Sequence, residues 1–272
     1  MTAFDWKKGT SVKTAGKTLE AVAFGPPPGE APTIVMLHEG LGSVALWRDF
    51  PQKLSDATGF GVFVYSRAGY GKSDPAELPR PLDYMTREAT QVLPEVLDAI
   101  GFRYGVLLGH SDGATIAAIY AGSIEDFRVR GLVLIAPHFF TEPEGLASIG
   151  EAKRNYEEGD LRQRLAKYHD DVDKAFRGWN DAWLDQRFTA WNVAEVIDYL
   201  RIPVLAVQGA DDQYGTMAQI NEIESRAYSP VDVEIIPDCG HAPHAEYPGR
   251  TLEVVGEFCA RLDRIEKEVV NL

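Results

Sequence analysis

Gly109-His110-Ser111-Asp112-Gly113 is the stretch of this sequence that decides the fold. The apolar run Val106-Leu107-Leu108 precedes it, and an apolar segment from Ala114 to Tyr120 follows it. A strand, then Gly-x-Ser-x-Gly, then a helix is the pattern of a nucleophile elbow, a sharp turn that presents the serine. The glycines suit such a turn because a Cβ there would meet the neighbouring strand or helix. Ser111 is therefore the candidate nucleophile, and the alternative is a tight Gly-Ser turn without chemistry.

Length, charge and cysteine content restrict the class of protein. The 272 residues can form one large α/β domain with a modest insertion. A net charge of −14 and a pI near 4.9 argue against binding to nucleic acids or anionic membranes. No apolar run approaches the roughly 20 residues of a membrane span, and the N-terminus lacks the apolar core of a signal peptide. With only Cys239 and Cys259, a disulfide framework is not expected, so we predict a cytoplasmic protein with a small-molecule substrate.

Apolar runs predict an α/β fold with a mostly parallel sheet and helices on both faces. Continuous runs are typical of strands buried on both sides, and they occupy Thr33–Leu37, Gly61–Tyr65, Gly105–Leu108, Leu132–Ile135, Val204–Val207 and Val233–Ile236. A strand pair is expected from about Lys8 to Phe24, around a turn at residues 14–17. Helical periodicity separates the runs at Trp47–Thr58, Tyr84–Ile100 and about Thr251 to Glu268. The last helix is expected to bury one face, made of Leu252, Val255, Phe258, Leu262 and Ile265.

One long segment interrupts this alternation. Residues 138–202 carry no strand pattern, which is too long for an ordinary connection between a helix and a strand. We expect residues 138–200 to form a helical cap over the carboxyl edge of the sheet, and residues 1–137 and 201–272 to form the core domain. Aromatic residues are concentrated in the segment, and the candidates for substrate binding are Phe139, Trp179, Trp183 and Trp191. The alternative is that these aromatics form the core of the cap itself.

A serine nucleophile needs a base, and the base needs an orienting carboxylate. His241 follows the last apolar run, and Gly240 leaves the backbone before it unrestricted. His244 is the alternative base, and otherwise has a supporting or helix-capping role with Glu246. A metal site made of His241, His244 and Glu246 is disfavoured because nothing else in the chain resembles a ligand set.

Two acids, Asp211 and Asp212, follow the apolar run at Val204–Val207. One of them should accept a hydrogen bond from the imidazole and so fix its tautomer and orientation. The other would then be a capping or solvated acid.

The chain resembles alpha/beta-hydrolase fold enzymes over nearly its whole length. The resemblance rests on Leu37-His38-Glu39-Gly40, Ser66-Arg67-Ala68-Gly69-Tyr70-Gly71-Lys72-Ser73-Asp74, the elbow, Gly209-Ala210-Asp211-Asp212 and Cys239-Gly240-His241. It implies a triad of Ser111, His241 and Asp212, because the family's acid usually stands third after the glycine of a Gly-x-x-Asp pattern. It also implies an oxyanion hole formed by the backbone N–H groups of Gly40, or of Glu39, and of Asp112.

Two positions depart from the family pattern. Relatives commonly have His-Gly where this chain has His38-Glu39-Gly40. A carboxylate near an oxyanion opposes the developing charge unless it is paired, with Arg67 or His38 as candidates, or turned away. Glu39 is kept as a candidate substrate-binding residue, although the plainer interpretation is that only its backbone faces the site. Asp112 either caps the elbow helix or meets a cationic group on the substrate.

Ser111 separates this chain from haloalkane dehalogenases and epoxide hydrolases, which resemble it but use a carboxylate nucleophile. The resemblance implies hydrolysis of a small-to-medium carboxylic ester through an acyl-serine intermediate. The alternative is carbon–carbon bond hydrolysis of an aromatic ring-cleavage product, which would need a cationic cap residue such as Arg187. Thioesterase, lactonase and non-catalytic ligand-sensor functions stay open on the same fold. No metal or organic cofactor is expected, and the sequence leaves a homodimer open.

Overall fold

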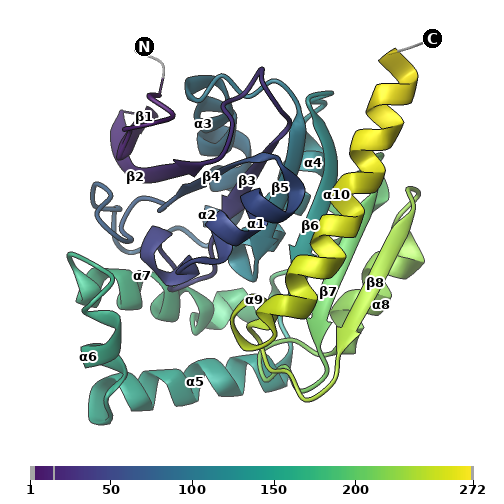
Figure 1. Cartoon of the computed structure of the whole chain (residues 1–272). Coiled ribbons are helices and arrows are strands. Elements are labelled where there is room, and N and C mark those ends of the chain that lie inside the picture. The colour runs from purple at the N-terminus through teal and green to yellow at the C-terminus, as the bar shows by residue number, and fades with distance from the viewer. Residues whose placement is uncertain (1–3, 15, 271–272) are drawn as a thin grey trace.

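An eight-stranded sheet forms the centre of the molecule. The computed structural model describes residues 4–14 and 16–270. The strand order is β1-β2-β4-β3-β5-β6-β7-β8, with β1, β2 and β4 paired antiparallel and all other neighbours parallel. The strands are β1 (Ser11–Thr14), β2 (Lys17–Phe24), β3 (Thr33–Leu37), β4 (Gly61–Tyr65), β5 (Gly105–His110), β6 (Val129–Ile135), β7 (Val204–Gly209) and β8 (Val231–Ile236). Every predicted apolar run is thus a strand, and the predicted fold class is confirmed (Figure 1). Ala15, in the predicted turn between β1 and β2, lies outside the described residues.

Helical elements connect the strands. Before the elbow they are η1 (Val44–Trp47), α1 (Phe50–Thr58), α2 (Tyr84–Arg87), η2 (Glu88–Val92) and α3 (Leu93–Ala99). The elbow helix is α4 (Asp112–Ser123). The elements after β6 are α5 (Pro143–Glu158), α6 (Leu161–Leu165), α7 (Val172–Trp183), η3 (Gln186–Ala190), η4 (Ala194–Tyr199), α8 (Met217–Arg226), α9 (Pro243–Glu246) and α10 (Pro248–Val270). None of the helices in the described part of the chain is long and apolar enough to cross a bilayer.

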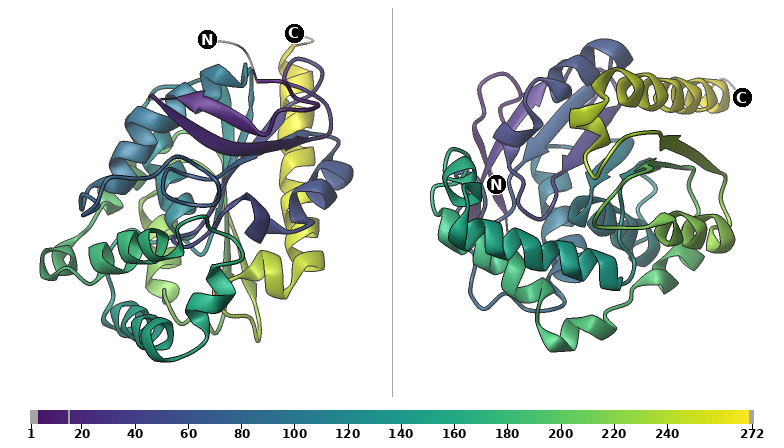
Figure 2. Two further views of the ribbon diagram at one scale, coloured as in Figure 1. Left: turned by 90° about the vertical axis from the view of Figure 1, so that its left-hand side faces the viewer. Right: turned by 90° about the horizontal axis from the view of Figure 1, so that it is seen from below.

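The sheet separates two apolar cores. Successive side chains of a strand point to opposite faces, so Ile34 and Met36 of β3 pack with α1 and α10, while Val35 and Leu37 pack with α3 and α4. Helices therefore cover both faces, as the views in Figures 1 and 2 show. The parallel strands are packed on both faces, and this packing fixes the positions of the loops at the carboxyl ends of the strands.

The predicted helix at Tyr84–Ile100 is not continuous. The structure has α2, a π-helical turn at η2 and then α3. Pro94 lies in the first turn of α3 and has no N–H to donate to the preceding turn. A π-helical turn accommodates such a break while the chain remains helical. One residue of the closing helix is also corrected, since Ile265 is 48% exposed rather than buried.

The long segment between β6 and β7 contains α5, α6, α7, η3 and η4. Figure 1 shows α5, α6 and α7 beyond the carboxyl ends of β6 and β7, and the right-hand view of Figure 2 shows α5 crossing this end of the molecule. We call residues 138–200 the inserted segment. Its position places its side chains over the loop that carries Ser111.

Candidate functional site

Ser111 lies on the turn between β5 and α4. Its φ of 53° and ψ of −120° are strained for a residue with a side chain. The turn is tight, because a Cβ at Gly109 would collide with the backbone of Gly113 and one at Gly113 would collide with the backbone of Leu37. The local structure is therefore a nucleophile elbow, with the serine directly before the N-terminus of α4.

His241 and Asp212 form a hydrogen-bonded pair. The His241 Nδ1 atom lies 2.9 and 2.8 Å from the Oδ1 and Oδ2 atoms of Asp212. Since a carboxylate only accepts, the Nδ1–H group of His241 is the donor in this pair. Asp212 also accepts hydrogen bonds from the Tyr214 N–H and the Gln208 amide, each over 2.8 Å. Burial raises the pKa of Asp212, but the hydrogen bond and charge of His241 outweigh it, so the pKa is lowered and the acid is ionised.

The alternative acid, Asp211, and the alternative base, His244, lie elsewhere. Asp211 is exposed, so of the two neighbouring acids it is Asp212 that meets the histidine. His244 is buried against Trp47 and His110, with ring centroids 4.6 and 4.7 Å away. Burial lowers the pKa of His244 to about 3, so it is neutral. Of these two histidines, His241 is the one that lines the cavity with Ser111.

Two anchors hold the loop that carries His241. The Glu246 carboxylate accepts hydrogen bonds from the Gly240 and Ala242 N–H groups over 2.9 and 3.1 Å. The His110 Nε2 atom lies 2.7 Å from the His241 carbonyl oxygen and donates to it. Because both anchors bind backbone atoms, the imidazole of His241 can bond to Asp212 and line the cavity.

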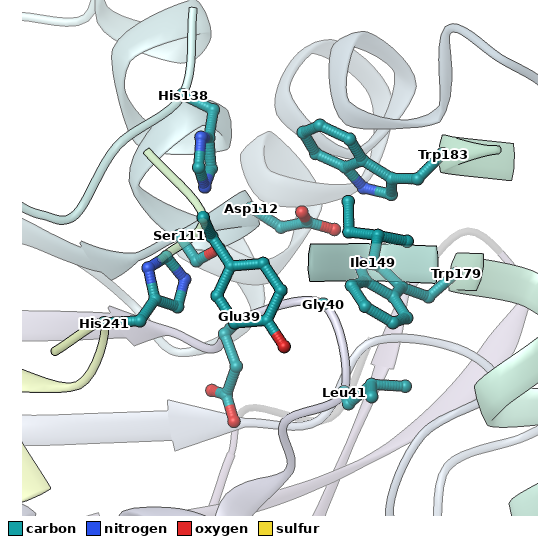
Figure 3. A pocket seen from close by; sticks show the side chains of 11 residues that line it. Glu39, Gly40, Leu41, Ser111, Asp112, His138, Ile149, Trp179, Trp183 and His241 are labelled. Atoms are coloured by element: carbon teal, nitrogen blue, oxygen red, sulfur yellow. The ribbon is translucent and has the colours of Figure 1, made fainter. Parts of the chain in front are cut away.

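Glu39 is directed away from the serine, as Figure 3 shows. Its Oε2 atom lies 3.6 Å from His110 Nδ1. Burial raises the pKa of Glu39, but the neighbouring His110 lowers it further, so the carboxyl is ionised. The partner is therefore His110 rather than Arg67, which donates instead to the backbone carbonyls of His38 and Glu39.

Asp112 lies in a buried polar cluster. Its Oδ2 atom accepts a hydrogen bond from the Tyr84 hydroxyl over 2.5 Å and lies 3.7 Å from the Arg67 guanidinium. Trp183 of α7 donates to the same Tyr84 hydroxyl over 3.0 Å. Burial raises the pKa of Asp112, although Arg67 and Tyr84 oppose the rise. The Asp112 side chain is thus linked through Tyr84 to Trp183 of the inserted segment, and it does not cap α4.

A cavity of about 110 Å³ opens on Ser111 and His241. Figure 3 shows Ser111, His138 and His241 on one side of it and an apolar wall on the other. The polar lining residues are Glu39, Ser111, Asp112, His138, Tyr214 and His241, and the remaining lining residues are Gly40, Leu41, Ile149, Trp179 and Trp183. Among the described residues, no hydrogen bond joins the Ser111 hydroxyl to His241. Such bonds are often long without substrate and shorten when it binds.

Both residues that are expected to supply the oxyanion donors line this cavity. Gly40 lines it, and the Asp112 N–H belongs to the first turn of α4, where backbone donors lack partners within the helix. A Cβ at Gly40 would collide with the indole of Trp179, so the inserted segment lies directly on this loop.

Only some of the predicted substrate-binding residues line the cavity. Glu39, Trp179 and Trp183 do so. Phe139 is fully buried in the core, and Trp191 stacks on Phe188 with ring centroids 5.1 Å apart, so these two residues pack instead.

Four lining residues were not predicted, and one of them, Leu41, directly follows Gly40. His138 follows β6 at the carboxyl edge of the sheet, and Tyr214 stands two residues after Asp212, so their positions carried a signal. Ile149 of α5 carried none. Burial lowers the pKa of His138 to about 3, so a neutral imidazole stands 5.5 Å from the His241 ring. Within residues 4–14 and 16–270, no group of three or more His, Cys, Asp or Glu side chains is arranged to hold a metal ion.

Comparison with known proteins identifies the family of the chain. The model of the alpha/beta hydrolase family matches residues 34–254. Epoxide hydrolase B of Mycobacterium tuberculosis (strain ATCC 25618 / H37Rv) is 32% identical over 124 residues, which are 46% of this chain and 34% of that protein. The chain thus aligns with about a third of the length of this curated relative.

Solved structures of similar fold cover most of the chain. The enol-lactonase from Burkholderia xenovorans LB400 has a TM-score of 0.72 and 18% identity, covering 92% of this chain and 99% of that one. An esterase from Rhodococcus sp. ECU1013 has a TM-score of 0.71 and 21% identity, covering 93% of this chain and 98% of that one. At these identities the similarity concerns the fold.

Proposed function

This chain belongs to the alpha/beta hydrolase family, and from that premise we propose that it is a serine hydrolase. Its substrate is a small-to-medium carboxylic ester or a related acyl compound. The observation that carries the proposal is the Asp212–His241 pair facing the cavity that Ser111 enters from a strained turn. Nucleophile, base and orienting acid are the groups that acyl transfer requires.

The first half of the reaction forms an acyl-serine. The Nε2 atom of His241 takes the proton of the Ser111 hydroxyl while its oxygen attacks the ester carbonyl carbon. The Gly40 and Asp112 N–H groups hold the negative oxygen of the tetrahedral intermediate. The carbon–oxygen bond to the leaving group then breaks, and His241 gives its proton to the departing alkoxide.

The second half releases the acid. His241 takes a proton from water, and the resulting hydroxide attacks the acyl carbon. The bond from that carbon to Ser111 breaks, and the serine oxygen recovers its proton from His241. Asp212 stays ionised throughout and stabilises the imidazolium that forms twice.

The cavity supports an uncharged acyl substrate over the carbon–carbon bond alternative. A ring-cleavage product carries a carboxylate that needs a cationic partner, and no Lys or Arg is among the lining residues. Arg187, the residue considered for this role, is exposed and paired with Asp185 over 2.7 Å. The apolar wall instead suits an alkyl or aromatic portion of the substrate.

Active-site labelling tests the proposal. A fluorophosphonate probe should label the wild-type protein, and labelling should be lost in Ser111→Ala and His241→Ala. His244→Gln is the matched histidine control and should keep it. Turnover of 4-nitrophenyl esters of increasing acyl length should then size the cavity. Failure of the wild-type protein to label would contradict the proposal and favour a non-catalytic ligand sensor.

A further inference from the structure

Within the described part of the chain, one oxygen of Asp112 has no hydrogen-bond partner. The side chain is 1% exposed, and its Oδ2 atom takes the Tyr84 hydrogen bond. The Oδ1 atom is buried and accepts no hydrogen bond from any described residue. A buried acceptor without a partner costs free energy, and folded proteins rarely leave one.

The position of the Asp112 side chain connects it with the proposed reaction. Asp112 lines the cavity next to Ser111, and Figure 3 shows its carboxylate between the serine and Trp183. Trp179, Trp183 and Ile149 make the facing wall apolar. A polar group on a bound substrate would lose its hydration against that wall but could bond to Asp112.

The charge near Asp112 is already balanced. The Arg67 guanidinium lies 3.7 Å from Oδ2 and is itself buried. Arg80 packs nearby, with its guanidinium over the ring of Tyr84, 5.3 Å from the ring centre. A cationic substrate group would therefore meet two fixed positive charges, whereas a neutral donor would meet a free acceptor.

We propose that Asp112 Oδ1 accepts a hydrogen bond from a hydroxyl on the acyl part of the substrate, so that the substrates are esters of short hydroxy acids. This inference rests on the proposed serine-hydrolase function. The acyl part is the relevant one because Asp112 follows Ser111 directly. An acyl group on the serine stays beside Asp112 through the second half of the reaction, while the leaving group departs.

Two isosteric esters test the inference in the wild-type protein. The 4-nitrophenyl esters of 3-hydroxybutanoate and 3-methylbutanoate differ by a hydroxyl in place of a methyl group. We expect kcat/KM to be at least about 10-fold higher for the hydroxy ester, because a buried charged acceptor is satisfied only by that substrate. The 3-ammoniobutanoate ester should be poorer than the hydroxy ester.

Variants locate the effect. In Asp112→Ala the hydroxy-to-methyl ratio of kcat/KM should fall to about one. Asp112→Asn keeps the side-chain volume and loses the charge, so the ratio should fall at least about threefold even if the alanine variant does not fold. Asp56→Asn, an exposed aspartate of α1, is the matched control and should keep the wild-type ratio.

The outcomes distinguish failure of the hydroxyl assignment from failure of the proposed serine-hydrolase function. A wild-type ratio near one, with both esters hydrolysed and Ser111 labelled, overturns the hydroxyl assignment and leaves the serine hydrolase standing. Preference for the ammonio ester also overturns it, since Asp112 would then act as a counter-ion. If Ser111 is not labelled and no ester is hydrolysed, the proposed function fails and this inference fails with it.

Discussion

The His110 side chain donates a hydrogen bond to the backbone carbonyl of His241 over 2.7 Å. The residue before Ser111 thus holds the backbone of His241, 131 positions later in the chain. The other nitrogen of His110 faces Glu39 at 3.6 Å. A carboxylate that would oppose an oxyanion if it pointed into the site is here part of the support for the base loop.

Replacing Glu39 tests this support. Glu39→Gln should lower kcat for a 4-nitrophenyl ester about 10-fold, with KM nearly unchanged, because His110 loses its anionic partner and positions His241 less well. Glu39→Asp should recover part of the loss. An unchanged kcat in Glu39→Gln would contradict the positioning role, and a change in KM alone would indicate direct contact with the substrate.

The two adjacent acids provide a matched pair. Asp212→Asn should reduce kcat by about 10³–10⁴, because an amide can donate to His241 Nδ1 and so favour the wrong tautomer. Asp211→Asn changes an exposed acid and should retain wild-type activity. Steady-state kinetics with one ester checks both variants, and equal losses would contradict the assignment of the triad acid.

Strain at Ser111 should appear in stability as well as in activity. Ser111→Ala keeps a Cβ at φ 53°, whereas Ser111→Gly removes it. We expect the glycine variant to have a free energy of unfolding about 1–2 kcal/mol higher than that of the alanine variant, with both variants inactive. Urea denaturation measures the difference, and equal stabilities would show that the turn is not strained.

Two buried neutral histidines should make the fold sensitive to acid. The pKa values of His138 and His244 are lowered to about 3 by burial, below the ordinary value of 6.5. Between these pH values the unfolded chain binds more protons than the folded one, so stability is full above pH 6.5 and falls as the pH falls towards 3. The slope should be about 1.4 kcal/mol per pH unit for each histidine.

Urea denaturation between pH 7 and pH 4 measures that slope. His138→Gln and His244→Gln should each make the dependence shallower. A dependence as steep as that of the wild type in both variants would assign the acid sensitivity to other groups.

Breaking the Tyr84 link should destabilise the protein. Tyr84→Phe removes the donor to Asp112 and the acceptor for Trp183. The expected loss is about 2–3 kcal/mol in the free energy of unfolding, since a buried charged acceptor loses its partner. Tyr120→Phe, which removes a hydrogen bond to the partly exposed Asp126, should cost less.

Much of the fold could be predicted because parallel strands are buried on both faces. Their sequences are continuous apolar runs, and the runs at Thr33–Leu37 and Gly61–Tyr65 match β3 and β4 residue for residue. The elbow could also be predicted from the sequence, because such a tight turn requires glycine at Gly109 and Gly113. The π-helical turn at η2 was not predicted, because apolar spacing persists through a local change of helical pitch.

The contents of the cavity were harder to predict. Trp183 and Trp191 are the same residue type in the same segment, yet one lines the cavity and the other stacks on Phe188. Burial alone does not distinguish an aromatic ring facing a ligand from one facing protein. The hydrogen bond between Tyr84 and Asp112 could not be predicted either, because the two residues are 28 positions apart and meet only in the folded chain.

The hydrogen bonds from Trp183 to Tyr84 and from Tyr84 to Asp112 limit how this protein can be re-engineered. Transplanting the helices of a relative between β6 and β7 would take away Trp183 and leave the Tyr84 hydroxyl without its donor. Reshaping the binding wall therefore alters the residue next to the nucleophile. A change made for substrate selectivity is therefore expected to change turnover as well. A chimera that retains activity is expected to keep a tryptophan at the position of Trp183.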